Sequence, residues 1–262
     1  MEIPWRRSLK WIAIAGAAVP AVVVLAVAAS ESISFGFGPA DRNYVEGFRV
    51  GWARGTTSRW SREDATVTLP VRVRGRASLI VLGGRPERGA SEIDVEQNGV
   101  VLGSIPAGSR IAPFSFDLAP GPAAFRFRSR APDSGHGLKL EELRLVPGER
   151  GALLPEARSI ALSAAAGLLF AAALVIAGFS ARASAFLATA ILGLPLAALD
   201  PFASLHWLRV ASLVSSFSSL LAALLLRSQP KWRTLVVLST LLAGSFALFH
   251  PSYYFKDVDI HR

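Results

Sequence analysis

The sequence contains no cysteine and only one methionine among its 262 residues. The absence of cysteine excludes a disulfide framework, a thiol nucleophile and any zinc or iron–sulfur site that requires cysteine ligands. Charged residues make up only 18% of the chain, and acidic residues are fewer than basic ones, 19 against 28. The fold must therefore be held together by the burial of apolar side chains.

The few charges are distributed unevenly along the chain. Residues 31–158 carry 18 basic and 15 acidic residues, whereas residues 159–199 contain a single charge, Arg182. The basic residues outside the polar segment lie beside apolar runs, so the net charge of +9 indicates a membrane and not a nucleic-acid partner.

Five apolar runs approach the roughly 20 residues that a helix needs to cross a hydrocarbon layer about 30 Å thick. They comprise residues 11–29, 159–181, 183–199, 205–226 and 234–249. The third and fifth are the shortest. We predict an α-helical transmembrane bundle of about five helices. The first run has an alternative interpretation as a signal peptide, because basic residues precede it and Ala26-Val27-Ala28 resembles a cleavage site.

Basic residues flank these runs asymmetrically. Seven lie on one side of the predicted spans (Arg6, Arg7, Lys10, Arg182, Arg227, Lys231 and Arg233), and four on the other (Arg158, Arg209, Lys256 and Arg262). The positive-inside rule then predicts a multi-pass protein of a bacterial inner membrane with a cytoplasmic N-terminus. The expected parts are an anchor (1–30), a periplasmic domain (31–157), a four-helix region (158–250) and a periplasmic tail (251–262).

Small residues recur at a spacing of four in two of the runs. The positions are Gly167, Ser212, Ser215, Ser216 and Ser219. This spacing allows helix backbones to approach closely in lipid, so we expect these residues to pack against other helices. Either the helices of this chain pack on one another, or they bind a separate membrane protein.

The polar segment shows short alternating runs separated by glycine and proline, which is typical of β-strands and turns. The clearest strands are residues 65–69, 77–82, 91–96, 100–105, 114–118, 123–128 and 138–145. Asn98-Gly99 predicts a two-residue type I′ hairpin turn. Most prolines are expected between strands. The fold class is therefore a membrane protein with an all-β sandwich, jelly-roll-like outer domain and a helical bundle.

Several segments of this domain carry a resemblance to a known class. They are Phe35-Gly36-Phe37-Gly38, Ser58-Arg59-Trp60-Ser61, and the stretches 65–70, 95–103 and 137–145. Together they resemble the carbohydrate-binding-like sandwiches attached to bacterial polytopic membrane proteins, including GT-C, mannosyltransferase-like glycosyltransferases. The resemblance implies an acidic motif in the first outer loop of a catalytic bundle, which here would be Asp257 or Asp259 after residues 234–249. Because the sequence stops soon afterwards, we expect a truncated or repurposed piece of a longer ancestor.

A cluster of aromatic and basic residues provides the candidate ligand site of the polar domain. It comprises Tyr44, Trp52, Arg54, Arg59 and Trp60. An aromatic face beside guanidinium donors can stack on a sugar ring or bind an anionic head group. The alternative is that a tryptophan fills the sandwich core while the arginine stems cover its rim.

The C-terminal tail offers a second, weaker candidate. If the tail is extended, Asp257, Asp259 and His261 share one face and are candidates for metal binding or general-base chemistry. The alternative is a solvated tail behind an aromatic interfacial belt formed by residues 253–255. His206 and His250 are candidates to ligate a haem or chlorin of a neighbouring subunit, or simply lie at the membrane interface.

No Gly-x-Ser-x-Gly elbow and no P-loop occurs in the sequence. We therefore expect a non-catalytic integral membrane accessory or scaffolding subunit without a cofactor. Its expected partners are membrane lipids, other membrane protein subunits, and a glycan or glycolipid. Two alternatives remain: a truncated GT-C-like glycosyltransferase and a membrane-anchored glycan-binding protein.

Overall fold

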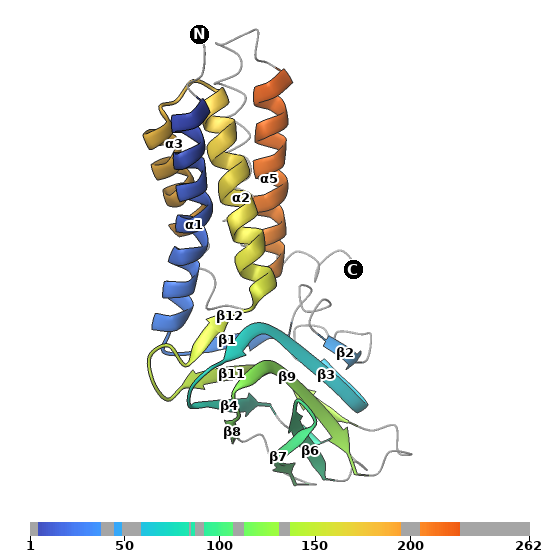
Figure 1. Cartoon of the computed structure of the whole chain (residues 1–262). Helices are drawn as coiled ribbons and strands as arrows, with labels where there is room; N and C mark the ends of the chain where they lie inside the picture. The colour runs from blue at the N-terminus through green and yellow to red at the C-terminus, as the bar shows by residue number, and fades with distance from the viewer. Residues whose placement is uncertain are drawn as a thin grey trace. The chain divides into compact units, whose positions relative to one another are not determined.

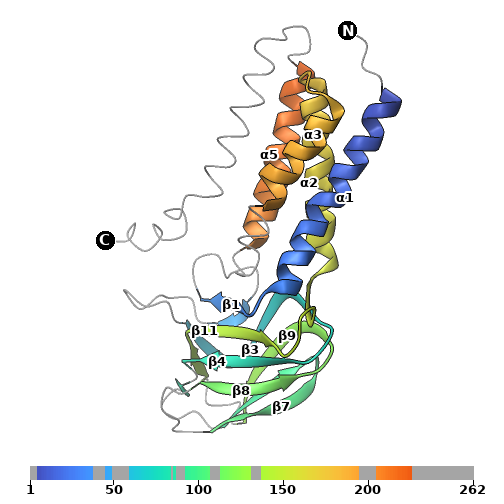
Figure 2. The ribbon, with the colours of Figure 1, turned by 90° about the vertical axis from the view of Figure 1, so that its left-hand side faces the viewer.

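A computed structural model describes most of the chain and divides it into two units. The described residues are 5–37, 45–48, 59–83, 85–86, 92–106, 113–130, 137–194 and 205–225. One unit is helical and contains, among these, residues 5–26, 157–194 and 205–225; the other contains the strands between residues 27 and 156. Figures 1 and 2 show the elements of both units.

The strands form two antiparallel sheets that pack face to face. The smaller sheet has the order β1 (Ile33–Gly36), β11 (Glu142–Pro147), β4 (Ala77–Leu82) and β8 (Phe114–Leu118). The larger has the order β5 (Arg85–Pro86), β10 (Leu138–Leu140), β3 (Arg59–Val73), β9 (Gly121–Ser129), β6 (Ile93–Gln97) and β7 (Val100–Ile105). Two further strands, β2 (Val45–Phe48) and β12 (Leu153–Pro155), also pair with β3. The predicted β-sandwich is confirmed.

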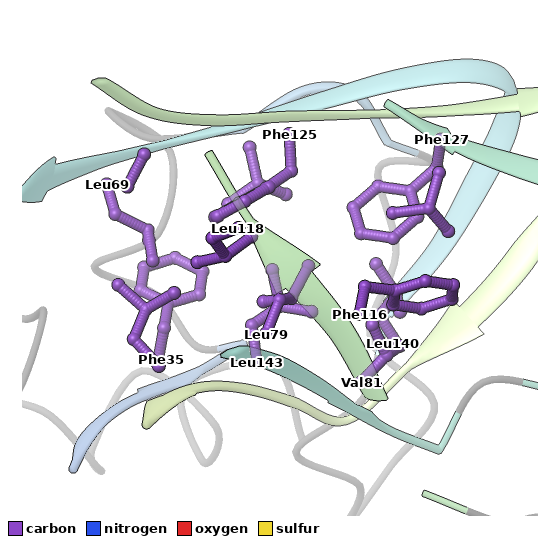
Figure 3. Close-up of a cluster of buried hydrophobic side chains, with 14 of the residues drawn as sticks. Phe35, Leu69, Leu79, Val81, Phe116, Leu118, Phe125, Phe127, Leu140 and Leu143 are labelled. Carbon is purple, nitrogen blue, oxygen red and sulfur yellow. The ribbon is translucent and has the colours of Figure 1, made fainter. Parts of the chain in front are cut away.

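Phenylalanine and aliphatic side chains fill the space between the sheets. Figure 3 shows Phe125 and Phe127 of β9 facing Phe35, Leu79 and other side chains of the smaller sheet. The core follows from strict alternation, since every second residue of β4, β6 and β9 is buried. No tryptophan belongs to the buried core in the part of the chain that the structure describes.

The hairpin between β6 and β7 has the predicted form. Gln97 pairs with Val100 across a two-residue loop, and Asn98 and Gly99 have φ angles of 52° and 83°. Both angles lie in the left-handed region that a type I′ turn requires, and asparagine and glycine tolerate it best. The predicted strands 77–82, 100–105 and 114–118 also have the observed bounds of β4, β7 and β8.

The prediction of one continuous strand over residues 138–145 is wrong. Residues Leu138–Leu140 form β10 of the larger sheet, whereas residues from Glu142 onward form β11 of the smaller one. The buried residues change parity at Glu141, because Leu138 and Leu140 face the core before it and Leu143 and Leu145 after it. A single residue therefore carries the chain from one sheet to the other.

The expectation that prolines fall mostly between strands needs correction at five positions of the described chain. Strands β3, β5, β9, β11 and β12 include Pro70, Pro86, Pro122, Pro147 and Pro155, respectively. Pro70 lies where the β3–β9 register shifts between Thr68 and Arg72, so its missing N–H removes no regular ladder bond there. Such irregular positions admit proline within a sheet.

The helical unit contains α1 (Trp5–Ala29), α2 (Ala157–Ile176), α3 (Ala181–Ala188), the π-helical turn η3 (Thr189–Gly193) and α5 (Leu205–Leu225). By length and composition, Arg6–Ala29 and Ala157–Ile176 can each span a membrane. The apolar helices Ala181–Gly193 and Leu213–Leu225 are shorter. The predicted bundle of about five spans is therefore not confirmed, and the fifth run, residues 234–249, lies outside the described residues.

Local capping rules determine the tight connection between α2 and α3. Gly178 has a φ of 105° and donates its N–H to the Val175 carbonyl, while Phe179 donates to Leu174, which is the Schellman pattern of a helix end. Ser180 then caps α3, since its Oγ accepts a hydrogen bond of 3.3 Å from the Ala183 N–H. This connection places Arg182 in the first turn of α3.

Candidate binding faces

Trp60 lies near the start of β3, on the outer face of the larger sheet. The next residue, Ser61, is buried, and its Oγ accepts a 2.7 Å hydrogen bond from the Leu138 N–H. Gly137 permits this approach, because a Cβ there would lie 2.3 Å from Ser61 Oγ. Since successive strand residues point to opposite faces, burial of Ser61 directs the half-buried Trp60 outward.

Polar and charged side chains surround this tryptophan. Lys139 of β10 is its direct cross-strand partner, and its Nζ lies 3.4 Å from Glu141 Oε1. Arg62 and Asp64 follow on the same face of β3, and both are exposed. A half-exposed indole flanked by a cation and a carboxylate can stack on a sugar ring and hydrogen-bond its hydroxyl groups.

Most other members of the predicted cluster are not described. Tyr44, Trp52 and Arg54 lie outside the described residues, and of Arg59 only the backbone is placed, paired with Leu140. The core-filling alternative does not apply to Trp60, because phenylalanines occupy the core. The proposed cluster is therefore represented in the structure by Trp60 alone.

The tail candidates and the histidines cannot be placed either. Asp257, Asp259, His261 and His250 lie outside the described residues, and His206 is placed only as part of α5. Within the described ranges, no three histidine, aspartate or glutamate residues come together in a way that could hold a metal ion. The glycosyltransferase-like alternative thus stays a prediction.

A second feature of the outer face is a set of surface ion pairs, which the sequence analysis did not predict. Arg126 of β9 binds Asp64 of β3, with 2.8 Å between Nε and Oδ1. Arg130, just after β9, binds Asp94 of β6 at 2.8 Å and also Glu92. The sequence pattern that could have predicted these pairs is the alternation of arginine with phenylalanine in Phe125-Arg126-Phe127-Arg128. This alternation places the guanidinium groups on one face of β9.

The ion pair with Arg126 lowers the pKa of the Asp64 carboxyl, mainly through the hydrogen bond and despite partial desolvation. The same hydrogen bond raises the pKa of Arg126. Both side chains are about half exposed, at 45% for Arg126 and 44% for Asp64, so solvent screens much of the attraction. Because these charges neutralise one another, this part of the face is a solvated surface and not an anion site.

The interior of the helical unit combines small and hydroxyl-bearing residues with larger apolar ones such as Val19, Phe170 and Leu174. Gly167 of α2 packs on α1 so closely that a Cβ there would lie 2.9 Å from the Ala15 carbonyl oxygen. Ser163 donates its hydroxyl to the Ser159 carbonyl at 2.9 Å. Ser216 and Ser219 of α5 are buried and Ser215 is half-buried, whereas the side chain of Ser212 is not described.

The exterior of the helical unit also carries many large apolar residues. Phe186 is 73% exposed and Leu225 is 72% exposed. Other exposed large apolar side chains of the unit are Leu9, Ile14, Leu25, Leu168, Leu194, Val214, Phe217, Leu221 and Leu224. The described helical unit contains no aspartate or glutamate. This surface would be costly in water, where contiguous apolar patches of this kind are rare.

No protein-family model matches the chain, and no curated protein is similar to it. The solved structures that match it include several carbohydrate-binding modules. A family 35 module from Clostridium thermocellum is 13% identical, with a TM-score of 0.32 over 45% of this chain and all of the module.

Two further matches have similar extents. The family 35 module of Abf62 from Cellvibrio japonicus is 14% identical, with a TM-score of 0.31 over 48% of this chain and 97% of the module. The C-terminal family 6 module of LamC from Zobellia galactanivorans is 15% identical, with a TM-score of 0.28 over 44% of this chain and 98% of the module. The assignment of a sandwich to this chain rests on its own strand pairing.

Proposed function

We propose that the chain is a non-catalytic integral membrane protein in which the helical unit is embedded in a bilayer and the β-sandwich is an extracytoplasmic binding module. In this role it is an accessory or scaffolding subunit of a larger membrane assembly. The start of α1 lies on the cytoplasmic side.

The observation that carries the proposal is the set of large apolar side chains exposed on the helical unit. Large apolar side chains such as Phe170 and Leu174 lie inside beside alanine, glycine and serine, but many others, among them Phe186 and Leu225, lie outside. In water the hydrophobic effect drives large apolar side chains inward, but lipid removes this force and leaves close packing and hydrogen bonding to hold helices together. Two helices of spanning length support the same proposal.

The distribution of charge supports the proposed orientation. Arg6, Arg7 and Lys10 at the start of α1 lie at the same end of the helical unit as Arg182, whose guanidinium lies over the Trp11 ring. Only Arg158 provides an exposed charge in the first turn of α2, which begins at the other end. The end richer in basic residues faces the cytoplasm in most membrane proteins.

Membrane integration and orientation can be tested in cells. The full chain should remain in the membrane pellet after alkaline carbonate extraction. External protease should cut the sandwich in right-side-out membranes and leave it intact in inverted vesicles. Release by carbonate would refute integration, and cleavage only in inverted vesicles would refute the orientation.

The accessory role requires partners. Extraction in a mild detergent should yield a complex larger than the chain and its micelle, and crosslinking should identify other membrane proteins in it. A chain that elutes as a monomer, with no crosslinked protein, would contradict the accessory role without affecting the proposed membrane integration.

A second candidate function is glycan binding by the sandwich, and it is favoured by the half-exposed Trp60 beside Lys139. The full chain in detergent should bind one class of glycan on an array. Trp60→Ala should reduce that binding by about two- to tenfold, because aromatic stacking contributes about 0.5–1.5 kcal/mol. Val101→Ala, at an exposed position of β7, is the matched control. Unchanged binding by Trp60→Ala with an unchanged melting temperature would refute this site.

A further inference from the structure

We propose that the basic end of the helical unit, formed by Arg6, Arg7, Lys10, Trp11 and Arg182, is a docking site for the phosphate headgroup of an anionic phospholipid. This inference rests on the proposed membrane integration. It adds a specific lipid class to that proposal and assigns the residues that recognise it.

The site brings together residues from distant parts of the chain. Arg7, Lys10 and Trp11 lie three and four residues apart on α1, so they share one face of that helix. The guanidinium carbon of Arg182 lies 5.6 Å from the centroid of the Trp11 ring, a cation–π contact between α3 and α1. The Schellman turn at Gly178 and the Ser180 cap hold Arg182 in this position.

These cations have no opposite charge among the described residues of the unit. Arg6, Arg7, Lys10 and Arg182 are all exposed, and the described residues of the helical unit include no aspartate or glutamate. Arg6 and Lys10 are also four residues apart on one helix, a spacing at which like charges repel. An anion from outside the unit would relieve this repulsion.

The chemistry of the site fits a lipid headgroup better than a free anion. Guanidinium groups bind phosphate oxygens through paired hydrogen bonds. Trp11 is half-buried, and tryptophan is enriched at the depth of the headgroups. The exposed apolar side chains Leu9 and Ile14 lie beside the cations on α1, where they can contact acyl chains.

The test uses the full chain purified in a non-ionic detergent, with bound lipid counted by native mass spectrometry. Phosphatidylglycerol should bind at least tenfold more tightly than phosphatidylcholine with the same acyl chains. Each cation near an anionic lipid surface contributes a similar increment to the binding affinity. Arg182→Gln should therefore weaken phosphatidylglycerol binding about fivefold, and the triple variant Arg6→Gln/Arg7→Gln/Lys10→Gln should abolish the preference for phosphatidylglycerol.

Arg158→Gln is the matched control, since Arg158 is an exposed arginine in the first turn of α2 and lies outside the site. It should leave the preference unchanged. For the unmodified chain, added salt should release phosphatidylglycerol because the attraction is screened, which tests the site even if a variant fails to fold.

Three results would overturn the proposal: equal binding of the two lipids, equal losses in Arg182→Gln and Arg158→Gln, or complete displacement of the lipid by inorganic phosphate, which would indicate a free-anion site. The failure of this inference is separable from failure of the proposed function. A chain that resists carbonate extraction but shows no lipid preference refutes the docking site alone.

Discussion

The two units of this chain expose opposite kinds of side chain. The sandwich hides Phe125, Phe127 and a set of large aliphatic residues, and displays arginine and aspartate. The helical unit buries alanine, glycine and serine together with larger residues such as Phe170 and Leu174, and it exposes Phe186 and other large apolar residues. This difference is the one that the proposed membrane integration requires, with water around the sandwich and lipid around the helical unit.

The contrast predicts different responses to the same kind of substitution. Truncating a large side chain should be severe in the sandwich, where burial stabilises, and mild on the outside of the helical unit. The predictions below use paired positions to test this contrast, beginning with the largest expected effect.

Phe127→Ala should lower the free energy of unfolding of the sandwich by about 3–5 kcal/mol, because it removes a side chain that is 1% exposed and leaves a cavity. Phe186→Ala, at a position that is 73% exposed, should change stability by less than about 1 kcal/mol. Chemical denaturation of the full chain in detergent, followed by circular dichroism, measures both. Similar losses would remove the contrast between the two units.

Introducing a charge on the surface should be costly in the helical unit and nearly neutral in the sandwich. Phe186→Lys should weaken membrane insertion, but by less than the about 2.5–3.5 kcal/mol that a lysine costs at the centre of a spanning helix, because Phe186 lies only one turn from Arg182 at the proposed headgroup depth. Val101→Lys, at a position 54% exposed on β7, should have an effect near zero because water surrounds it. Insertion efficiency in a translocation assay and the melting temperature, respectively, check these outcomes. An insertion efficiency of Phe186→Lys equal to that of the unmodified chain would argue against a lipid-facing surface there.

Close packing inside the helical unit can be tested at Gly167. Gly167→Leu should destabilise the unit by about 1–3 kcal/mol, because a Cβ at this position already lies 3.0 Å from Val19 Cγ2. Ala161→Leu, at an exposed position of the same helix, is the matched control and should be neutral. Thermal unfolding in detergent compares them, and equal melting temperatures would contradict the close α1–α2 contact.

The smallest effect is expected from the ion pair on the sandwich. The pKa of Asp64 is lowered in the folded state, so the ionised carboxylate raises the free energy of unfolding above about pH 4. This stabilisation is lost as the pH falls through the folded pKa. Because the pair is half exposed, the contribution is at most about 1 kcal/mol. Unfolding free energies at pH 7 and pH 2 should differ less in Asp64→Asn than in the unmodified chain, and an identical pH dependence would contradict this.

Local signals in the sequence were sufficient to predict much of the sandwich. Alternation predicted β4, β7 and β8 with their observed bounds, and Asn98-Gly99 predicted the hairpin turn. The break at Glu141 was not predicted, because residues 138–145 are uniformly compatible with a strand and only the packing of two sheets decides which side of each residue is buried. Propensity carries no information about such a change of sheet.

The candidate sites were predicted less completely, because their residues come together only through contacts between segments that are distant in sequence. The types of residue around Trp60 pointed to an aromatic and basic face, but its partner Lys139 lies far away in sequence and became a neighbour only through the β3–β10 register. The contact between Arg182 and Trp11 likewise joins segments that sequence spacing cannot relate. In the helical unit, apolar length predicted five spans, whereas two helices of the described chain meet the requirement.

Glu141 also links the two layers of the sandwich mechanically. Its N–H donates to the Leu82 carbonyl and its own carbonyl accepts from Phe37, so its backbone is anchored in the smaller sheet while its neighbour Leu140 belongs to the larger one. Adjacent Cα atoms are only about 3.8 Å apart, so the layers cannot slide independently at this point. A force that a molecule bound at Trp60 exerts on Lys139 would therefore reach the smaller sheet through two peptide bonds.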